Sequence, residues 1–155
     1  MAKKKQHTVL KVPAIEHGTV IDHLPPRAAL TVVRILAVLE DLVTIGVNLS
    51  SHVMGRKDVV KIANRKLSPD EVAKIAIIAP RATLNIIESY VVVKKYTVTP
   101  PDVVEGIVRC VNPSCITNHE TVRTRFSVLK AEDGSLRLRC AYCERAYDRQ
   151  EIEIV

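Results

Sequence analysis

Four cysteines in the last third of the sequence form two closely spaced pairs, Cys110-x4-Cys115 and Cys140-x2-Cys143. Each pair can sit on a tight turn, and two such turns can bring four sulfur atoms to the corners of a tetrahedron around Zn²⁺, about 2.3 Å from the metal. With four thiolate ligands the coordination shell is closed, so no position remains for a catalytic water. The spacing therefore predicts a structural zinc site with one ion per chain.

Two other uses of these thiols stay open. The four cysteines could form two disulfide bonds, and Cys140-x2-Cys143 could act as the redox pair of a thiol enzyme. The basic residues 1–7, which we expect to form a flexible tail, are not followed by the apolar segment of a secretory signal, so we expect a cytoplasmic, reducing location. Nothing else resembles a thioredoxin-like unit, and a metal-bound thiolate is not free for redox chemistry. We therefore prefer zinc.

Charged residues at the ends of predicted strands form a second group that could do chemistry. Asp22 and His23 end one strand, and Lys57, Lys61 and Lys95 belong to others. A carboxylate beside several cations suits a phosphorylated sugar, because the carboxylate accepts from ribose hydroxyls and the ammonium groups meet the phosphates. Charged residues at strand ends are usually only solvated, so the spacing alone leaves the ligand site open. Phosphate-loop, dinucleotide, zinc-protease and nucleophile-elbow motifs are absent, which disfavours an enzyme.

The part of the chain that must position these residues alternates strands and helices. One helix is expected to open at Pro25-Pro26, with an apolar face that extends to Leu39. A second begins at the capping box that starts at Ser68 and stops before Pro80. Strands are expected at residues 9–15, 18–23, 43–49, 57–64 and 86–93. This order predicts an α+β, ferredoxin-like fold, with two helices on one face of an antiparallel sheet.

A change of domain is expected at residues 96–102, where consecutive prolines remove backbone donors. We place one domain at residues 1–100 and a second at residues 101–155. In the second, strands are expected at residues 123–128 and 136–139, with a hairpin turn at Asp133-Gly134. Together with the cysteines, they predict a small all-β zinc ribbon of the rubredoxin-like type.

Composition sets limits on the class of protein. Apolar residues make up 47% of the 155 residues and aromatic residues only 3%, so the core is built from aliphatic side chains. No apolar stretch approaches the roughly 20 residues of a membrane span, so we expect no membrane partner. The net charge of +6 raises a zinc-ribbon nucleic-acid-binding protein as an alternative. Residues 107–155 hold eight basic and seven acidic side chains with three aromatics, which argues against nucleic acid.

Taken together, the motifs resemble the regulatory chain of aspartate carbamoyltransferase over residues 8–155. In the N-terminal part, the resemblance rests on Gly18-Thr-Val-Ile-Asp-His23, Met54-Gly-Arg-Lys-Asp58 with Lys61-Ile62, Ala82-Thr-Leu-Asn85 and Tyr90-Val-Val-Val-Lys-Lys95. In the C-terminal part, it rests on Cys110-x-Asn-Pro-x-Cys-Ile-Thr117 and Cys140-x-Tyr-Cys-Glu144. Each motif is weak alone, but their order and spacing together are specific.

The resemblance implies a non-catalytic allosteric subunit of pyrimidine biosynthesis that binds CTP, ATP or UTP and docks on the catalytic chain through its zinc domain. It implies a homodimer, three of which bridge two catalytic trimers in a hetero-dodecamer. Carried over by motif, Asp22 meets the ribose, His23 and Lys95 the phosphates, and Lys61 the ribose or base. The base edge is expected at Ala14, Ile15, Tyr90 and Val92, with Lys57 and Asn85 nearby. Asn112 and Glu144 become candidate contacts to the catalytic chain.

Overall fold

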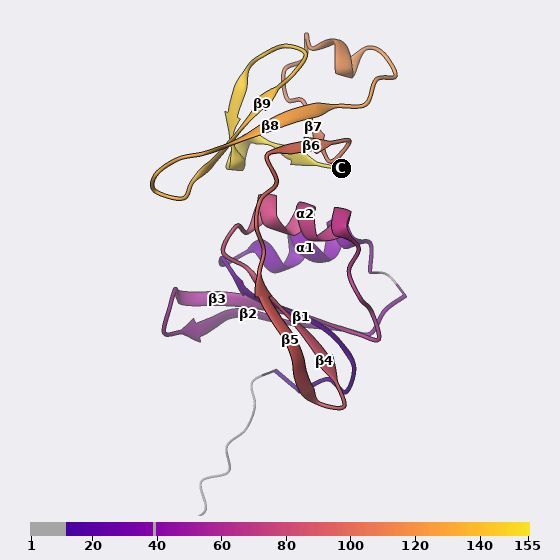
Figure 1. Cartoon of the computed structure of the whole chain (residues 1–155), viewed down its shortest axis with the longest axis vertical. Helices are drawn as coiled ribbons and strands as arrows, with labels where there is room; N and C mark the ends of the chain where they lie inside the picture. Colours follow the sequence, from indigo (N-terminus) through magenta and orange to yellow (C-terminus); the bar gives the residue numbers. More distant parts are fainter. Residues whose placement is uncertain (1–11, 39) are drawn as a thin grey trace, which may run out of the picture.

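The computed structural model describes residues 12–38 and 40–155, so the expected basic tail lies outside the described residues. The N-terminal half consists of an antiparallel sheet with two helices on one face (Figure 1). Its elements are β1 (Gly18–Leu24), α1 (Ala28–Leu36), β2 (Val43–Ser51), β3 (Gly55–Ala63), α2 (Pro69–Ile78), β4 (Thr83–Glu88) and β5 (Val91–Thr97). The strand order β2-β3-β1-β4-β5 is the ferredoxin-like order with β5 added at one edge. The predicted fold class is confirmed.

The core of this half lies between the sheet and the helices. Successive strand residues point to opposite faces, so Ile21, Val60 and Leu84 face the helices while their neighbours face away. Val32 of α1 and Ile75 of α2 pack against them, and neither is exposed to solvent. The opposite face of the sheet has no helix over it (Figure 1).

The two helices begin in different ways. The Ser68 hydroxyl accepts from the Glu71 N–H, and the Glu71 carboxylate accepts from the Ser68 N–H, so the predicted capping box is confirmed. By contrast, α1 begins at Ala28, later than predicted, because the prolines form a turn and Arg27 adopts a left-handed φ of 76°. The helix ends at Leu36, so the prediction that its apolar face extends to residue 39 is wrong. Residue 39 lies outside the described residues.

A buried carboxylate supplies the cap that α1 lacks. Asp58 of β3 is fully buried, and its Oδ2 accepts from the Ala29 N–H at 3.2 Å in the first turn of α1. Its Oδ1 accepts from the Asn48 N–H at 2.8 Å, where β2 shifts register against β3. One side chain therefore fixes both the start of α1 and the irregular part of β2.

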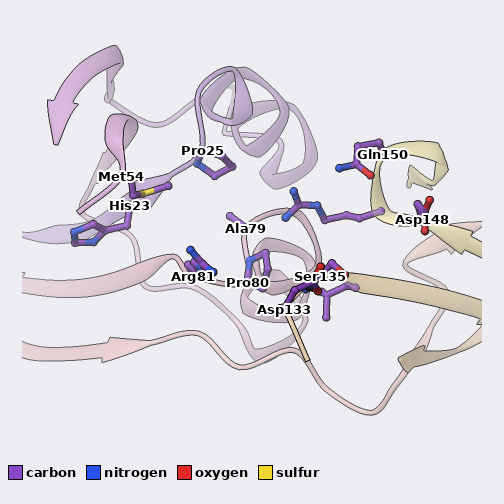
Figure 2. Close-up of a pocket in the computed structure, with 13 residues that line it drawn as sticks. His23, Pro25, Met54, Ala79, Pro80, Arg81, Asp133, Ser135, Asp148 and Gln150 are labelled. Atoms are coloured by element: carbon purple, nitrogen blue, oxygen red, sulfur yellow. Dashed lines mark hydrogen bonds between the residues drawn. The ribbon is translucent and has the colours of Figure 1, made fainter. Parts of the chain in front are cut away.

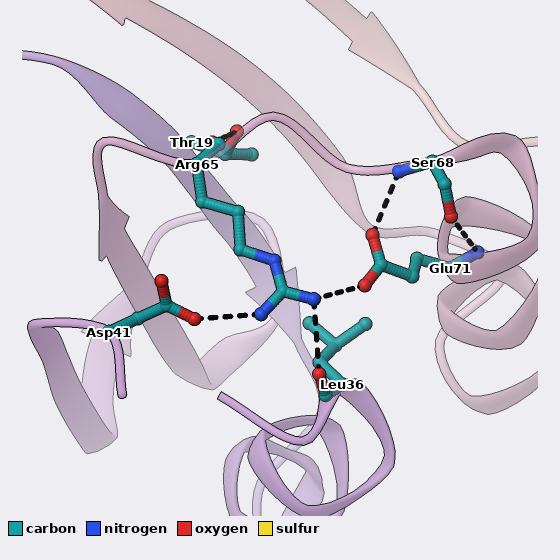
Figure 3. Close-up of polar contacts among 6 residues, drawn as sticks. All are labelled: Thr19, Leu36, Asp41, Arg65, Ser68 and Glu71. Carbon is teal, nitrogen blue, oxygen red and sulfur yellow. Dashed lines mark hydrogen bonds and ion pairs between the residues drawn. The ribbon is translucent and has the colours of Figure 1, made fainter. Parts of the chain in front are cut away.

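A second polar cluster surrounds Arg65 in the loop between β3 and α2 (Figure 3). Its guanidinium contacts Asp41 at 2.7 Å and the Leu36 carbonyl at the end of α1 at 3.2 Å, and it also pairs with Glu71 of the capping box. The Arg65 carbonyl accepts from the Thr19 hydroxyl of β1 at 2.7 Å. Arg65 thus joins the end of one helix to the start of the other.

Two strand predictions are wrong. Residues 12–15 of the strand expected at 9–15 are not extended in a sheet, and residues 9–11 lie outside the described residues. The single strand expected at 86–93 is instead the end of β4, a turn and the start of β5, because Ser89 and Tyr90 adopt left-handed φ values of 50° and 65°. Neither is glycine, so this hairpin has no usual turn signal in the sequence.

The C-terminal half is a small all-β unit, which completes the predicted fold class. Its strands are β6 (Val103–Glu105), β7 (Val108–Arg109), β8 (Arg125–Lys130), β9 (Leu136–Cys140), β10 (Ala146–Asp148) and β11 (Glu153–Ile154), with short 3-10 turns η1 (Ile116–Asn118) and η2 (Arg149–Glu151). Four strands form a sheet in the order β10-β9-β8-β6, and β11 pairs with β7. Phe126 and Leu138 are fully buried at its centre.

Helix α2 joins the two halves. It lies on the helical layer that faces the C-terminal unit (Figure 1), and Ile77, which is fully buried, belongs to the apolar cluster around Phe126. Ala73, one turn earlier, packs against the same cluster. No helix in residues 12–38 and 40–155 is long and apolar enough to cross a bilayer.

Candidate functional site

The four cysteine sulfur atoms meet at one point of the C-terminal unit. All four lie within 4.8 Å of one another, and the Sγ–Sγ distances are 3.7 Å for Cys110–Cys143 and 3.8 Å for Cys115–Cys140. A tetrahedron of sulfurs about 2.3 Å from a zinc ion has edges of about 3.8 Å, so the donor set fits this metal. The distances are far longer than the roughly 2.05 Å of a disulfide bond, and all four cysteines are free.

The acidities of these thiols show why the cluster needs a cation. Burial raises the pKa of Cys110 to about 12. Burial also opposes ionisation of Cys143, but the N–H of Arg145 and the Asn112 side chain outweigh it and lower that pKa to about 6. Four adjacent thiolates would repel one another without a positive charge among them. A bound divalent cation would hold all four as thiolates.

Polar groups around the cysteines fix their geometry. The Thr117 hydroxyl donates to Cys115 Sγ at 3.2 Å, and the Tyr147 hydroxyl lies 3.9 Å from Cys110 Sγ. Asn118 Nδ2 donates to the carbonyls of Cys110 and Asn112 and so braces the first cysteine turn. Sequence reasoning assigned no role to these three residues: Thr117 lies in the first cysteine motif, two residues after Cys115, whereas Tyr147 has no local signal.

The two predicted contacts to a catalytic chain lie on the cysteine turns. Asn112 is only 9% exposed, and its Oδ1 accepts from the Ser114 N–H at 3.1 Å, so its side chain shapes the first turn. Glu144 is exposed beside the second turn, with a left-handed φ of 60°. Of the two, Glu144 offers the more accessible side chain.

Several predicted nucleotide-binding residues line up across the face of the sheet that the helices leave open. Lys61 of β3 and Asn85 of β4 both pair with Val20 of β1, and Asn85 pairs in turn with Lys95 of β5. Paired residues on neighbouring strands point to the same face. The structure therefore brings Lys61, Asn85 and Lys95 into one row on this face, from strands far apart in the sequence.

Lys94, next to Lys95, belongs to the other face. It pairs with Ile86, and its Nζ lies 5.2 Å from the centre of the Tyr96 ring, which packs on the core beneath the helices. Adjacent strand residues alternate between faces, so only Lys95 joins the row.

Asp22 adds a carboxylate at one end of this face. Its Oδ1 lies 2.8 Å from Lys57 Nζ and accepts from the His23 N–H at 2.6 Å. Burial opposes ionisation, but the hydrogen bonds from Lys57 and His23 lower the pKa of Asp22 below its usual value. Asp22, Lys57 and Lys61 line a hollow of about 450 Å³. It places one carboxylate and two cations beside an apolar wall of Val20, Leu49 and Val59.

The segment before β1 lies against both parts of this face. Lys61 Nζ donates to the Pro13 carbonyl at 2.6 Å, and burial lowers the pKa of Lys61 although the charge of Asp22 opposes the change. The Tyr90 N–H donates to the Glu16 carbonyl at 2.9 Å. Ala14 and Ile15 therefore run between Lys61 and the β4–β5 turn, with Val92 just beyond that turn on β5.

His23 stands apart from the row. Its Nδ1 lies 3.1 Å from the Thr83 hydroxyl, and the residue also lines a cavity between the two halves of the chain (Figure 2). Sequence reasoning had no signal for this cavity, because its walls come from segments more than a hundred residues apart.

Comparison with known proteins relates both halves to one family. The model of the aspartate carbamoyltransferase regulatory chain, allosteric domain, matches residues 10–99, and that of its metal binding domain matches residues 102–153. The aspartate carbamoyltransferase regulatory chain of Pyrococcus abyssi is 51% identical over 147 residues, which cover 92% of this chain and 95% of that protein. The one of Parabacteroides distasonis is 44% identical over 155 residues, which cover 99% and 98%. These matches confirm the resemblance. The chain belongs to the family of aspartate carbamoyltransferase regulatory chains and is a regulatory subunit, not a catalytic one.

Proposed function

We propose that this chain regulates an aspartate carbamoyltransferase by binding CTP, ATP or UTP on the open face of its N-terminal sheet. The observation that carries the proposal is the row of Lys61, Asn85 and Lys95, with the Asp22–Lys57 pair at one end. Ammonium groups and a carboxylate on one surface suit the phosphates and ribose of a nucleotide.

The roles follow from where each group lies. Lys95 meets the phosphates, since no carboxylate of the described residues neutralises it, whereas Lys57 is already paired with Asp22. Asp22 accepts from the ribose hydroxyls, and Lys61 contacts the ribose or base. The backbone of Ala14, Ile15, Tyr90 and Val92 reads the base edge, with Asn85 beside it and His23 near the phosphates.

The rest of the chain supports assembly. We propose that residues 1–100 form the nucleotide-binding domain and residues 101–155 the docking domain, with one Zn²⁺ held by Cys110, Cys115, Cys140 and Cys143. The ion would lock the cysteine turns that carry Asn112 and Glu144, the proposed contacts to the catalytic chain. In the cytoplasm, three dimers of this chain would bridge two catalytic trimers in a hetero-dodecamer.

Lys94 provides a matched control for the nucleotide site. Lys95→Ala should weaken CTP binding about tenfold or more in calorimetry, because it removes a charge-assisted contact to phosphate. Lys94→Ala makes the same change of charge on the other face and should bind CTP like the original chain. Equal affinities for the two variants would contradict the proposed site.

Two further measurements test the assembly. Metal analysis should find one zinc per chain; a red, iron-loaded protein would show that the S₄ site selects iron instead.

Co-expression with the catalytic chain encoded in the same genome should yield a complex with equal numbers of both chains. A regulatory chain that elutes alone under these conditions would contradict the proposed docking.

A further inference from the structure

A cavity of about 470 Å³ opens between the two halves of the chain, away from the row on the open sheet face. Figure 2 shows His23 and Met54 on one side of this space and Asp148 and Gln150 on the other. Its size lies within the range of small-molecule sites, which form preferentially between domains.

Two arginines, one from each half, line this cavity. Arg81 comes from the loop between α2 and β4, and Arg149 from η2. Among the described residues, neither guanidinium takes part in a hydrogen bond or an ion pair. The two carboxylates in the lining are already engaged: Asp148 pairs with Arg137 at 3.1 Å, and Asp133 accepts from the Ser135 N–H at 2.9 Å. Arg137 neutralises Asp148, whereas Asp133 keeps its charge, so the two arginines leave the lining with one net positive charge.

The remaining lining is mixed. The Gln150 amide supplies another donor. Pro25, Pro80 and Leu136 supply apolar wall. Donors beside apolar wall select a ligand with an anionic group on an apolar body.

We propose that this interdomain cavity binds a small metabolite that carries a phosphate or carboxylate group on an apolar or aromatic body, with Arg81 and Arg149 as its anion contacts. Because each arginine belongs to a different half, the bound molecule bridges them. It therefore favours the arrangement in which both guanidinium groups reach the anion. This site lies apart from the row of Lys61, Asn85 and Lys95, and His23 is the residue that it shares with the proposed nucleotide site.

The test uses phenylphosphonate, which is a stable anion on an aromatic body. It is titrated into the full, zinc-loaded chain and followed by heteronuclear NMR. The expected result is a saturable shift of signals in both halves, including Arg81, Ser135 and Arg149. Arg81→Gln and Arg149→Gln should each weaken binding about tenfold, the typical effect of losing a hydrogen bond to a charged group. Arg139→Gln, an exposed arginine on the β8–β9 face, should bind like the original chain.

Other outcomes would overturn the proposal. Shifts confined to one half would exclude a bridging ligand, and shifts only around Lys61 and Lys95 would place the anion on the open sheet face. Unchanged affinity in a folded Arg149→Gln variant would remove the proposed contact. The Lys95→Ala variant separates the two sites: it should lose CTP binding and keep the phenylphosphonate shifts around Arg81 and Arg149. Loss of the cavity shifts in that variant would also overturn the proposal.

Discussion

Lys57 on β3 and Asp22 on β1 form an ion pair of 2.8 Å whose side chains keep only 21% and 23% of their exposure. The pair joins two neighbouring strands at the point where β1 shifts register against β3. An ion pair so shielded from water holds its geometry better than a fully exposed one. It therefore presents the Asp22 carboxylate in one orientation.

Lys57→Met should raise the pKa of Asp22. Burial already disfavours the charged carboxylate, and the variant removes the strongest of the contacts that favour it. Because the pKa of Asp22 is lowered in the folded chain, the pair stabilises the fold above the ordinary aspartate pKa of 3.8 and loses this effect as the pH falls through the lowered value. An NMR titration of the Asp22 carboxyl carbon measures the change, with Lys66→Met as control. A pKa that stays the same in both variants would contradict the prediction.

Arg65→Met should destabilise the chain in a pH-dependent way. Burial opposes ionisation of Glu71, but bonds from Ser68 and Arg65 outweigh it and lower the pKa of Glu71 below 4.5. The contribution of this pair is thus complete above the usual glutamate pKa and disappears as the pH falls through the lowered one. Urea unfolding at neutral pH should show a loss of about 1–2 kcal/mol relative to Arg139→Met. The difference should shrink below the lowered pKa, and a constant difference at all pH values would argue against Glu71 as the partner.

Asp58→Asn should be one of the most damaging single substitutions in the first half. An asparagine oxygen can accept from Ala29 or Asn48, but its amide nitrogen then faces the other N–H donor. One buried donor without a partner and the lost charge should cost about 2–4 kcal/mol in urea unfolding. Asp70→Asn, an exposed acid in the first turn of α2, is the matched control and should cost under about 1 kcal/mol. Similar losses for both would show that Asp58 does not hold these two segments.

Zinc removal should unfold the C-terminal half. A small unit whose core contains only one phenylalanine depends on its metal, and structural zinc contributes on the order of 10 kcal/mol. With a strong chelator, NMR signals of β8 and β9 should collapse to unfolded positions while those of the N-terminal sheet stay dispersed. Added zinc should restore them and magnesium should not. Unchanged β8 and β9 signals after complete metal removal would contradict the role assigned to the cysteines.

The metal site could be predicted from the sequence because its ligands come in local pairs. A short spacing between cysteines restricts where their sulfurs can go whatever the rest of the fold does. The ferredoxin-like order was accessible for a similar reason, since the Ser68 capping box and the alternating strands are local patterns. Each cysteine pair, the capping box and each strand pattern can be recognised within a short run of consecutive residues.

The row on the open sheet face depends on longer-range pairing. Treating 86–93 as one strand leaves Asn85 and Lys95 at its two opposite ends, and only the turn at Ser89-Tyr90 folds them side by side. A register shift in β5, between the pairs Ile87–Val92 and Ile86–Lys94, then decides that Lys95 and not Lys94 lies opposite Asn85. Left-handed backbone at two non-glycine residues is imposed by the surrounding contacts, such as the Tyr90–Glu16 hydrogen bond, and local propensity does not reveal it.

The burial of Ile77 among second-half residues has a consequence for how such chains can be recombined. A chimera joined at the proline segment would pair the α2 of one parent with the C-terminal unit of another. The residue at position 77 of that helix would then pack against side chains around Phe126 that come from the other parent. Transplanting the C-terminal unit together with residues 73 and 77 of its own α2 should preserve that fit. The exchangeable unit of this protein is therefore discontinuous along the chain.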